Sequence, residues 1–367
     1  MEDSQRQPLS VKRISKDFPA RMPAKVSPIS VNHRFYVVGA DKPPEVTTKV
    51  VRMEGHHDQY EVLVEIDGVR AGARAFPRAL DGTSVKRSTA SRRIDVDDAL
   101  LQGFVPEHLA FDPVPRERVR PYRTFNDKLD RKIVRPTTVF APDGRRVFQD
   151  TSYPWGTIGL VETARGGGSG VVIGPRHLLT VSHAIDWAGV PPGFAANWVR
   201  FTPSSFDGNG PFGVTEGIHI YWYVQENGDR SLSATELQFD YVVVVLNTRI
   251  GERTGWMGAR GYVDAWDSLD VWQHMGYPAD LNSGQRPVFV NRVTLDGDDA
   301  GDDAHQFIRH RADVFPGQSG GPMFGWWSGD VGPRAVATQS GETSTDNFAS
   351  GGADLARLVG LARTDFP

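Results

Sequence analysis

From about residue 137 onward, apolar residues gather in short runs that glycine, proline and polar residues interrupt at close intervals. Runs of this kind, with no helical periodicity between them, are typical of antiparallel sandwiches and barrels. The pattern therefore predicts an all-β domain. The predicted strands span residues 137–140, 158–161, 170–173, 178–181, 198–201, 218–224, 241–246, 269–274, 288–295, 306–310 and 335–338.

Near the C-terminus the periodicity changes from strand to helix. Apolar residues recur there at helical spacing, at Leu355, Leu358, Val359 and Ala362. This spacing places them on one face of a helix. We therefore expect a terminal helix over residues 354–362 that packs this face on the domain.

The first 130 residues have a different texture. Residues 1–30 are rich in Lys, Arg, Pro and Ser without periodicity, which predicts a poorly ordered arm. Strand-like runs at 35–38 and 60–66, the second followed by an Asp-Gly turn, predict a small β-rich unit. Residues 79–130 read either as a charged linker with a short helix near 97–102, or as a cleavable segment between a pro-region and a mature enzyme.

Composition removes several functional classes. The chain has 367 residues, of which 39% are hydrophobic and 23% charged, as expected for an ordinary globular protein. It contains no cysteine, which excludes disulfides, thiol catalysis and cysteine-based zinc sites. The formal net charge of −4 gives no electrostatic case for nucleic-acid binding.

Targeting features are also missing from the sequence. No run approaches the roughly 18 apolar residues that a membrane helix needs, so no membrane partner is expected. The N-terminus carries acidic residues and no apolar signal region. We therefore expect a cytoplasmic protein, with secretion by an unrecognised route as the alternative.

Three short motifs carry residues suited to acyl transfer. The stretch Gly317-Gln318-Ser319-Gly320-Gly321-Pro322 presents a serine between glycines, which let the backbone turn sharply. His183 follows an apolar run, and Asp240 opens the apolar run 241–246. Taken singly, each has an ordinary structural reading as a Gly/Ser turn, a satisfied histidine or a strand-start cap. Together they supply a nucleophile, a base and an orienting carboxylate.

In this order, His183, Asp240 and Ser319 resemble the triad of the chymotrypsin-like serine proteases. The serine motif resembles that family's Gly-x-Ser-Gly-Gly-Pro, and residues 178–184 resemble its Leu-Thr-Ala-x-His. Three motifs in the right order make this resemblance specific.

A closer resemblance is to the V8-like, glutamyl-endopeptidase branch of that family. It rests on residues 139–146, residues 150–155 and the tripeptide Gly276-Tyr277-Pro278. The resemblance covers about residues 137–345, and residues 1–130 have no recognisable counterpart.

The resemblance implies a chymotrypsin-like double antiparallel β-barrel, preceded by the small β-rich N-terminal region. We accordingly divide the chain into residues 1–130, a pro- or accessory region with an arm and a charged linker, and residues 131–367, a trypsin-like serine protease domain. Within that domain, barrel one would span about 137–250 and barrel two about 260–345, before the helix. The N-terminal region would be a possible intramolecular partner of the enzyme.

The activity that the resemblance implies is hydrolysis of peptide bonds in a protein or peptide substrate, through an acyl-enzyme. Ser319 would be the nucleophile, His183 the general base and Asp240 the group that orients the base. The N–H groups of Gly317 and Ser319 would form the oxyanion hole. No metal or other cofactor is needed. An esterase with the same triad and a non-catalytic protease-like binding module remain open as alternatives.

Gln318 departs from the trypsin-like pattern. It stands where trypsin-like zymogens keep an aspartate that pairs with a freshly cut N-terminus. Residues 132–134 resemble an activation site, but Gln318 cannot form that ion pair. We therefore do not expect activation of the trypsinogen kind.

Four further residues are candidates for substrate binding. Asp313 falls where trypsin-like enzymes place a carboxylate that favours Arg or Lys, and its alternative reading is a hydrogen-bonded loop aspartate. Thr338 lies near the position where V8-like enzymes bind substrate Glu through a histidine, so a preference for Glu is in doubt. Ser340 and Gly341 are expected to line the groove for the substrate backbone. Separately, the acidic run 296–303 reads as a solvated hairpin tip or as a calcium site.

Overall fold

The computed structural model describes residues 6–23, 46–52, 60–66, 69–71, 85–87, 96–115, 139–140, 143–188, 194–226, 231–297, 303–343 and 345–367. The chain divides into two compact units, one of residues 26–82 and one of residues 1–25 together with 83–367. The unit boundaries therefore fall at 25/26 and 82/83 rather than at 130/131. The proposed pro- or accessory role of residues 1–130 stays a prediction.

The smaller unit contains one antiparallel sheet. Its strands are β1 (Val46–Arg52), β2 (Tyr60–Ile66) and β3 (Val69–Ala71), paired in the order β1-β2-β3. The predicted strand at 60–66 coincides with β2, and the predicted run at 35–38 lies outside the described residues. This confirms the expected small β-rich region.

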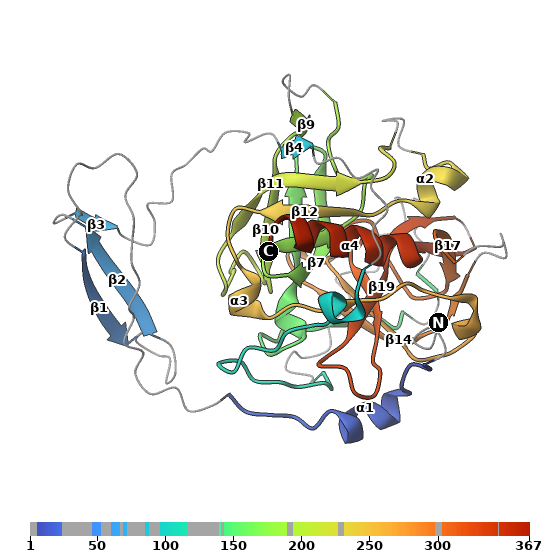
Figure 1. The fold of residues 1–367 in the computed structure, drawn as a ribbon, viewed down its shortest axis with the longest axis horizontal. Coiled ribbons are helices and arrows are strands. Elements are labelled where there is room, and N and C mark those ends of the chain that lie inside the picture. Colours follow the sequence, from blue (N-terminus) through green and yellow to red (C-terminus); the bar gives the residue numbers. More distant parts are fainter. Residues whose placement is uncertain are drawn as a thin grey trace, which may run out of the picture. The chain divides into compact units, whose positions relative to one another are not determined.

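The first sheet of the larger unit closes on itself (Figure 1). Six strands pair in the order β10-β6-β7-β8-β12-β11, and an additional pairing of β10 with β11 completes the ring. Two short strands, β4 (Val85–Arg87) and β9 (Phe194–Ala196), extend the sheet beyond β11. The ring strands are β6 (Ile158–Thr163), β7 (Gly166–Gly174), β8 (His177–Thr180), β10 (Val199–Pro203), β11 (Thr215–Trp222) and β12 (Val242–Leu246).

The second sheet forms a half-barrel from the C-terminal part of the chain. It pairs in the order β16-β17-β20-β19-β18-β14-β15-β5, and β13 adds in parallel to β19. Its strands are β5 (Arg146–Val147), β13 (Gly258–Ala259), β14 (Trp272–Gly276), β15 (Val288–Val293), β16 (Leu295–Asp296), β17 (Gln306–His310), β18 (Pro322–Gly325), β19 (Arg334–Glu342) and β20 (Asn347–Gly351). The all-β prediction is thus confirmed.

Helices are short except at the C-terminus. The last helix, α4 (Ala353–Asp365), buries the predicted apolar face and confirms the expected terminal helix. The expected short helix near 97–102 is the 3-10 helix η2 (Asp98–Leu101), which packs against α4. The other short helices are α2 (Ala234–Gln238), α3 (Gly251–Thr254), η4 (Trp155–Thr157), η5 (Asp264–Trp266) and η6 (Asn282–Gly284).

Among the described residues of the larger unit, three apolar clusters hold its two sheets, and a fourth holds the N-terminal segment. One lies within the first barrel and one within the second sheet. The third joins residues of both sheets to α4, with Trp155, Tyr241 and Leu358 among its buried members. Burial of this shared apolar surface fixes the two sheets against each other.

The prediction of a poorly ordered N-terminal arm over residues 1–30 is wrong for residues 6–23. Residues 6–23 are not an unattached tail, because they contain α1 (Val11–Asp17) and pack on the larger unit. Leu9, Ile14 and Phe18 are buried, and the Phe18 ring lies 4.8 Å from the ring of Trp326 between centroids. The Leu9 N–H also donates to the Trp326 carbonyl at 2.7 Å.

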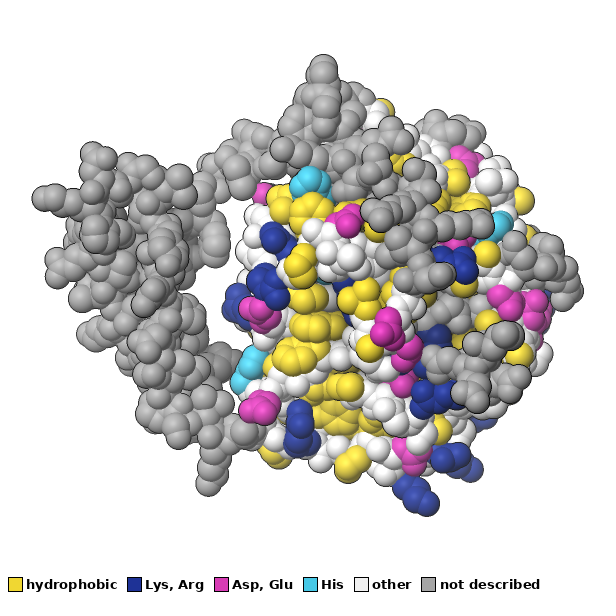
Figure 2. Space-filling model, in the orientation of Figure 1, with side chains coloured by type: hydrophobic (Ala, Val, Ile, Leu, Met, Phe, Trp, Pro, Cys, Tyr) yellow, Lys and Arg dark blue, Asp and Glu magenta, His cyan; other side chains and the backbone are white. Residues whose placement is uncertain are grey.

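Charged side chains of both signs are interspersed over the face seen in Figure 2, and neither sign gathers into a continuous field. Within the described part of the chain, no helix has the length and apolar character needed to cross a membrane.

Ile14 tests whether the N-terminal segment belongs to the folded body. Its side chain is 1% exposed, so Ile14→Ala removes a buried aliphatic group and leaves a cavity. We expect a loss of about 2–5 kcal/mol in the free energy of unfolding, measured by denaturant titration. Exposed Lys12 on the same helix supplies the control, and Lys12→Ala should leave stability near wild type. Equal stability of Ile14→Ala and wild type would contradict the packing described here.

Candidate active site

The pairing of β8 with β12 brings His183 close to Asp240. The two strands are antiparallel, and Thr180 at the end of β8 is opposite Val242 at the start of β12. His183 follows the end of β8, and Asp240 precedes the start of β12. Because the two strands are antiparallel, these two ends lie at the same edge of the sheet. Two residues 57 positions apart in sequence thus meet because of strand register.

The Asp240 carboxylate binds both the ring and the backbone of His183. Asp240 Oδ2 lies 2.6 Å from His183 Nδ1, and Asp240 Oδ1 accepts from the His183 N–H at 2.8 Å. Because an ionised carboxylate only accepts hydrogen bonds, the proton sits on Nδ1. The other ring nitrogen, Nε2, therefore has its lone pair available. This is the tautomer that a general base needs.

Strand β19 of the second sheet supplies two more donors to Asp240. The Ser340 hydroxyl donates to Asp240 Oδ2, and the Thr338 hydroxyl donates to the Asp240 carbonyl at 3.2 Å. The Asp240 side chain is 1% exposed, so the bonds from Ser340 and His183 compensate for the loss of water around its charge, while the Thr338 bond satisfies its backbone carbonyl. Of these two candidate substrate-binding residues, Thr338 is fully buried behind Asp240, and Ser340 lines the cleft.

Asp240 also sets the protonation of His183. Burial disfavours the imidazolium, but the Asp240 charge and its hydrogen bond favour it more strongly. The net effect raises the pKa of His183 above its ordinary value.

Ser319 lies in a loop whose shape depends on two glycines. Gly317 has φ +101° and Gly320 has φ +84°, in the region that favours glycine. A Cβ on Gly320 would lie 2.1 Å from the Ser169 carbonyl oxygen, and one on Gly317 would lie 2.5 Å from the Tyr277 carbonyl oxygen. Any other residue at either position would have to displace the backbone.

Ser169 on β7 anchors the Ser319 loop to the first barrel. Its hydroxyl donates to the Gly317 carbonyl at 2.7 Å, and its N–H donates to the Ser319 carbonyl at 2.7 Å. The Ser169 hydroxyl also accepts from the Tyr277 N–H at 2.8 Å, so its own position is fixed. Within the described part of the chain, the N–H groups of Gly317 and Ser319 meet no acceptor.

Ser169 is a residue of the site that was not predicted from the sequence. The run Gly166-Gly167-Gly168-Ser169-Gly170 could have drawn attention to it, because glycines allow close approach of another chain segment. A Cβ on Gly168 would lie 3.3 Å from the Ser319 carbonyl oxygen.

Gln318 is fully buried and holds the loop from the other side. Its side-chain oxygen accepts from the Phe315 N–H at 3.0 Å, and its amide nitrogen lies 3.0 Å from His274 Nε2. His274 Nδ1 lies 3.1 Å from the Pro322 carbonyl, which can only accept, so the proton is on Nδ1. Burial lowers the pKa of His274 to about 4 and keeps the ring neutral.

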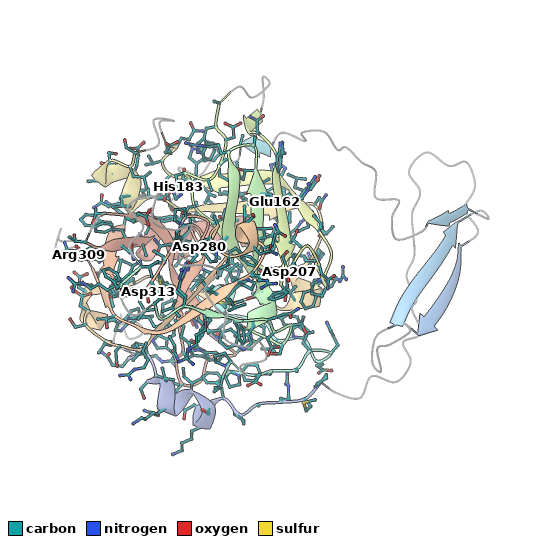
Figure 3. All side chains as sticks on the ribbon, turned by 180° about the vertical axis from the view of Figure 1, so that it is seen from behind. Glu162, His183, Asp207, Asp280, Arg309 and Asp313 are labelled. Carbon is teal, nitrogen blue, oxygen red and sulfur yellow. The ribbon has the colours of Figure 1, made fainter. Side chains whose placement is uncertain are left out.

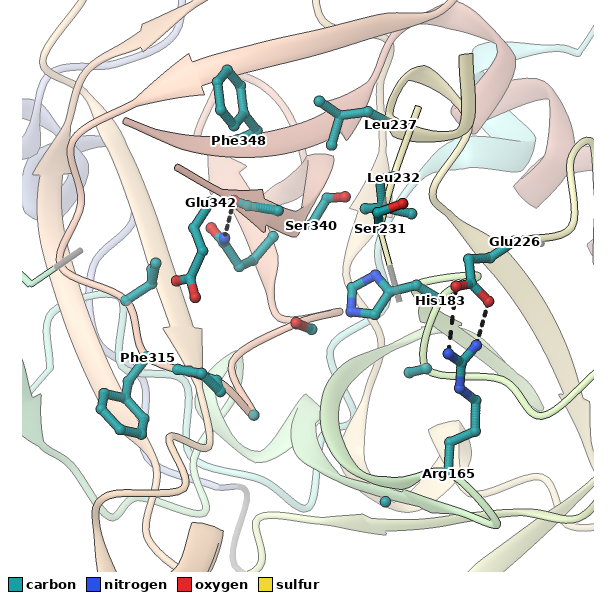
Figure 4. Close-up of a pocket in the computed structure, with 18 of the residues that line it drawn as sticks. Arg165, His183, Glu226, Ser231, Leu232, Leu237, Phe315, Ser340, Glu342 and Phe348 are labelled. Carbon is teal, nitrogen blue, oxygen red and sulfur yellow. Dashed lines mark hydrogen bonds and ion pairs between the residues drawn. The ribbon is translucent and has the colours of Figure 1, made fainter. Parts of the chain in front are cut away.

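His183 and Ser319 line one cleft of about 940 Å³, together with Gly317, Ser340 and Gly341 (Figure 4). Among the described residues no hydrogen bond joins the Ser319 hydroxyl to His183. Catalytic hydrogen bonds often form only once substrate is bound. The cleft thus collects the candidate nucleophile, the candidate base and two unpaired backbone donors.

Asp313 lies outside this cleft. Its two carboxylate oxygens accept from the N–H groups of Phe140 and Gly144, each at 2.6 Å. It is 7% exposed, and Figure 3 shows it well separated from His183. From the sequence, Asp313 is expected to be either a substrate-binding carboxylate or a hydrogen-bonded loop aspartate. These contacts match the second of the two readings.

The expected absence of metal and cofactor stays a prediction. Within the described ranges, no group of three or more His, Cys, Asp or Glu side chains is placed to hold a metal ion. The possible calcium run at 296–303 and the possible activation site at 132–134 lie partly or wholly outside the described residues.

No family model matches the chain. Glutamyl endopeptidase of Bacillus licheniformis is 24% identical over 193 residues, which cover 51% of this chain and 54% of that protein. The chain thus matches about half the length of this relative. A solved Glu endopeptidase in complex with MPD is 18% identical, with a TM-score of 0.50, over 62% of this chain and 99% of that one.

A second solved structure, the protease Anisep from Arthrobacter nicotinovorans, is 20% identical with a TM-score of 0.41, over 55% of this chain and 91% of that one. The Glu endopeptidase likeness confirms the chymotrypsin-like double-barrel fold. Together with the Bacillus relative, it confirms that this chain resembles the chymotrypsin-like serine proteases and, among them, the V8-like branch.

Proposed function

We propose that this protein is a serine endopeptidase that acts through His183, Asp240 and Ser319. The observation that carries the proposal is the His183 ring, which Asp240 fixes in the basic tautomer inside the cleft that Ser319 also lines. The similarity to glutamyl endopeptidases supports it.

The reaction would begin when a peptide carbonyl enters the cleft beside Ser319. His183 Nε2 takes the hydroxyl proton as Ser319 Oγ attacks the carbonyl carbon, and Asp240 stabilises the imidazolium that forms. The same proton then passes to the leaving amine, the C–N bond breaks and an acyl-enzyme remains. Water, activated by His183, hydrolyses the ester and restores Ser319.

The N–H groups of Gly317 and Ser319 would stabilise the oxyanion. Ser169 anchors the loop that carries them, since it binds the carbonyl groups of both residues on the side of the first barrel. Each such donor typically contributes about 10²–10³ in turnover. Donors held in this anchored loop before the substrate binds would need little reorganisation during the reaction.

A fluorophosphonate probe tests Ser319 as the nucleophile. We expect it to label the wild-type full chain and not Ser319→Ala, because the probe reacts only with an activated serine. Exposed Ser328 provides the matched control, and Ser328→Ala should label as wild type does. Unlabelled but folded wild type would contradict the proposal. Peptide amides and simple esters, assayed in parallel, separate the endopeptidase from the esterase, and tight binding without turnover would indicate the binding module.

The dependence of kcat/KM on pH tests the His183–Asp240 pair. His183 must be neutral to act as base, so activity falls as pH drops through its raised pKa, with a midpoint above the ordinary value of about 6.5. In Asp240→Asn the charge is gone, so the midpoint should move down and kcat should fall by about 10⁴-fold. Asp207, paired with Arg286 away from the cleft, is the control, and Asp207→Asn should keep the wild-type profile. An unchanged midpoint in Asp240→Asn would contradict the pairing.

His274 tests whether the Gln318 contact positions the oxyanion loop. In His274→Phe the Gln318 amide loses its partner, and we expect kcat to fall by about tenfold to hundredfold while KM stays near wild type. His177, on β8 of the first barrel, is equally buried and is hydrogen-bonded to the Ala362 carbonyl of α4, so His177→Phe controls for lost stability. Equal kcat values for the two variants would argue against the positioning role of His274.

A further inference from the structure

The oxyanion donors fix where a substrate side chain would go. Suppose that the scissile carbonyl binds the N–H groups of Gly317 and Ser319. The residue that contributes this carbonyl then carries its side chain on the Cα atom next to it. This side chain enters the part of the cleft between the segment before the Ser319 loop and the end of β19. The residues lining this part are Val314, Phe315, Pro316, Gly341, Glu342 and Phe348.

Glu342 lines this part of the cleft because it lies at the end of strand β19. It is the last residue of β19, where the ladder with β20 is irregular between Gln339 and Glu342, and it pairs with Asn347. Phe348, the next residue of β20, also lines the cleft. In Figure 4 the Glu342 carboxylate lies between Phe348 and Phe315 at the cleft.

The Glu342 carboxylate makes no hydrogen bond or ion pair with any described residue. The residue is exposed at the cleft, and the partial burial of its carboxylate raises its pKa. An unpaired carboxylate in the wall of a cleft attracts a cation, which a bound substrate could supply. A cationic group of the substrate could therefore form an ion pair with the Glu342 carboxylate.

The other carboxylate among the described residues of the cleft is already paired. Glu226 binds Arg165 through both of its oxygens, and Figure 4 shows this pair on the other side of His183 from Glu342. Arg165 is the one Lys or Arg among the described residues that line the cleft. An acidic substrate side chain beside Glu342 would therefore meet a like charge, and it would find no unpaired cation among the described residues of the lining.

The uncharged part of the wall suits a long cationic side chain. Phe315 and Phe348 offer aromatic surface to an aliphatic stem and to a guanidinium or ammonium head. Gln339, which is 3% exposed, adds a neutral amide to the same lining.

We propose that Glu342 selects Arg or Lys as the residue on the amino side of the bond that is cleaved. This inference rests on the proposed protease function and names its substrate class. Asp313, the candidate from sequence, has both oxygens on backbone N–H groups and leaves this role to Glu342.

The test has a binding arm and a turnover arm, both on the full chain. In the first, p-aminobenzamidine, an aromatic amidinium, is titrated by fluorescence into Ser319→Ala and into Ser319→Ala/Glu342→Gln. We expect about a tenfold or greater weakening of Kd in the second protein. In the turnover arm, kcat/KM is measured for peptides that differ only in Arg, Lys, Gln or Glu before the scissile bond. Arg and Lys should lead, Glu342→Gln should remove about tenfold of that lead, and Glu342→Lys should favour Glu.

Glu252 is the matched control, because it is an exposed glutamate of α3 outside the cleft. Glu252→Gln makes the same change of net charge and should keep the wild-type Kd and the wild-type order of peptides. Cleavage after Glu as fast as after Arg, or an Arg preference unchanged in Glu342→Gln, would overturn the inference. Amidinium binding that depends on Glu342 in a protein without turnover would support the cation site and overturn the proposed catalysis instead.

Discussion

The Asp240 carboxylate is the group on which the rest of the site depends. It is almost fully buried, and a buried charge is tolerated only when donors surround it. His183 supplies two of those donors from the first barrel, and Ser340 supplies the third from the second sheet. The tautomer of His183 is therefore tied to the docking of one sheet on the other. A change that shifts the sheets apart would disturb the chemistry before it unfolds either one.

The dependence between the two sheets is reciprocal. Strand β19 of the second sheet supports the histidine of the first barrel, and β7 of the first barrel supports the serine loop of the second. Ser169 reaches two carbonyl groups of that loop, and Gly320 leaves no room for a side chain at the contact. On the far side, Gln318 and His274 occupy a buried position with neutral hydrogen bonds, where trypsin-like enzymes use an ion pair. The loop is thus held from both directions without a charged new N-terminus.

Local patterns allowed much of this fold to be predicted. The apolar runs at 60–66 and 306–310 coincide with β2 and β17. The order of three short motifs pointed to His183 and Ser319, which line one cleft, and to Asp240, which binds His183. What escaped prediction depends on distant contacts. Strand β20 reads Asn-Phe-Ala-Ser-Gly and has little apolar pattern of its own, because its pairing with β17 and β19 decides its conformation. The buried residues of the N-terminal segment lie in a run of Lys and Arg and are recognisable only beside Trp326.

In the site, too, local sequence patterns predicted some features, and contacts between distant residues decided the others. The motifs gave the residue types that acyl transfer requires, but they could not say which backbone groups Asp313 would bind. Nor could they place Glu342 in the cleft wall, since its direction follows from the irregular pairing at the end of β19. Residue chemistry is therefore readable from the chain, whereas the partner of each polar group is set by packing.

The attachment of residues 6–23 has a consequence for the integrity of the molecule. This segment contacts the body through buried side chains and a backbone hydrogen bond to Trp326, none of which is a covalent link. If the chain were nicked between residues 23 and 96, the short fragment would remain bound. A denaturing gel would then show two pieces where native mass spectrometry still shows one particle of the original mass. Covalent continuity and structural continuity are separate properties in this protein.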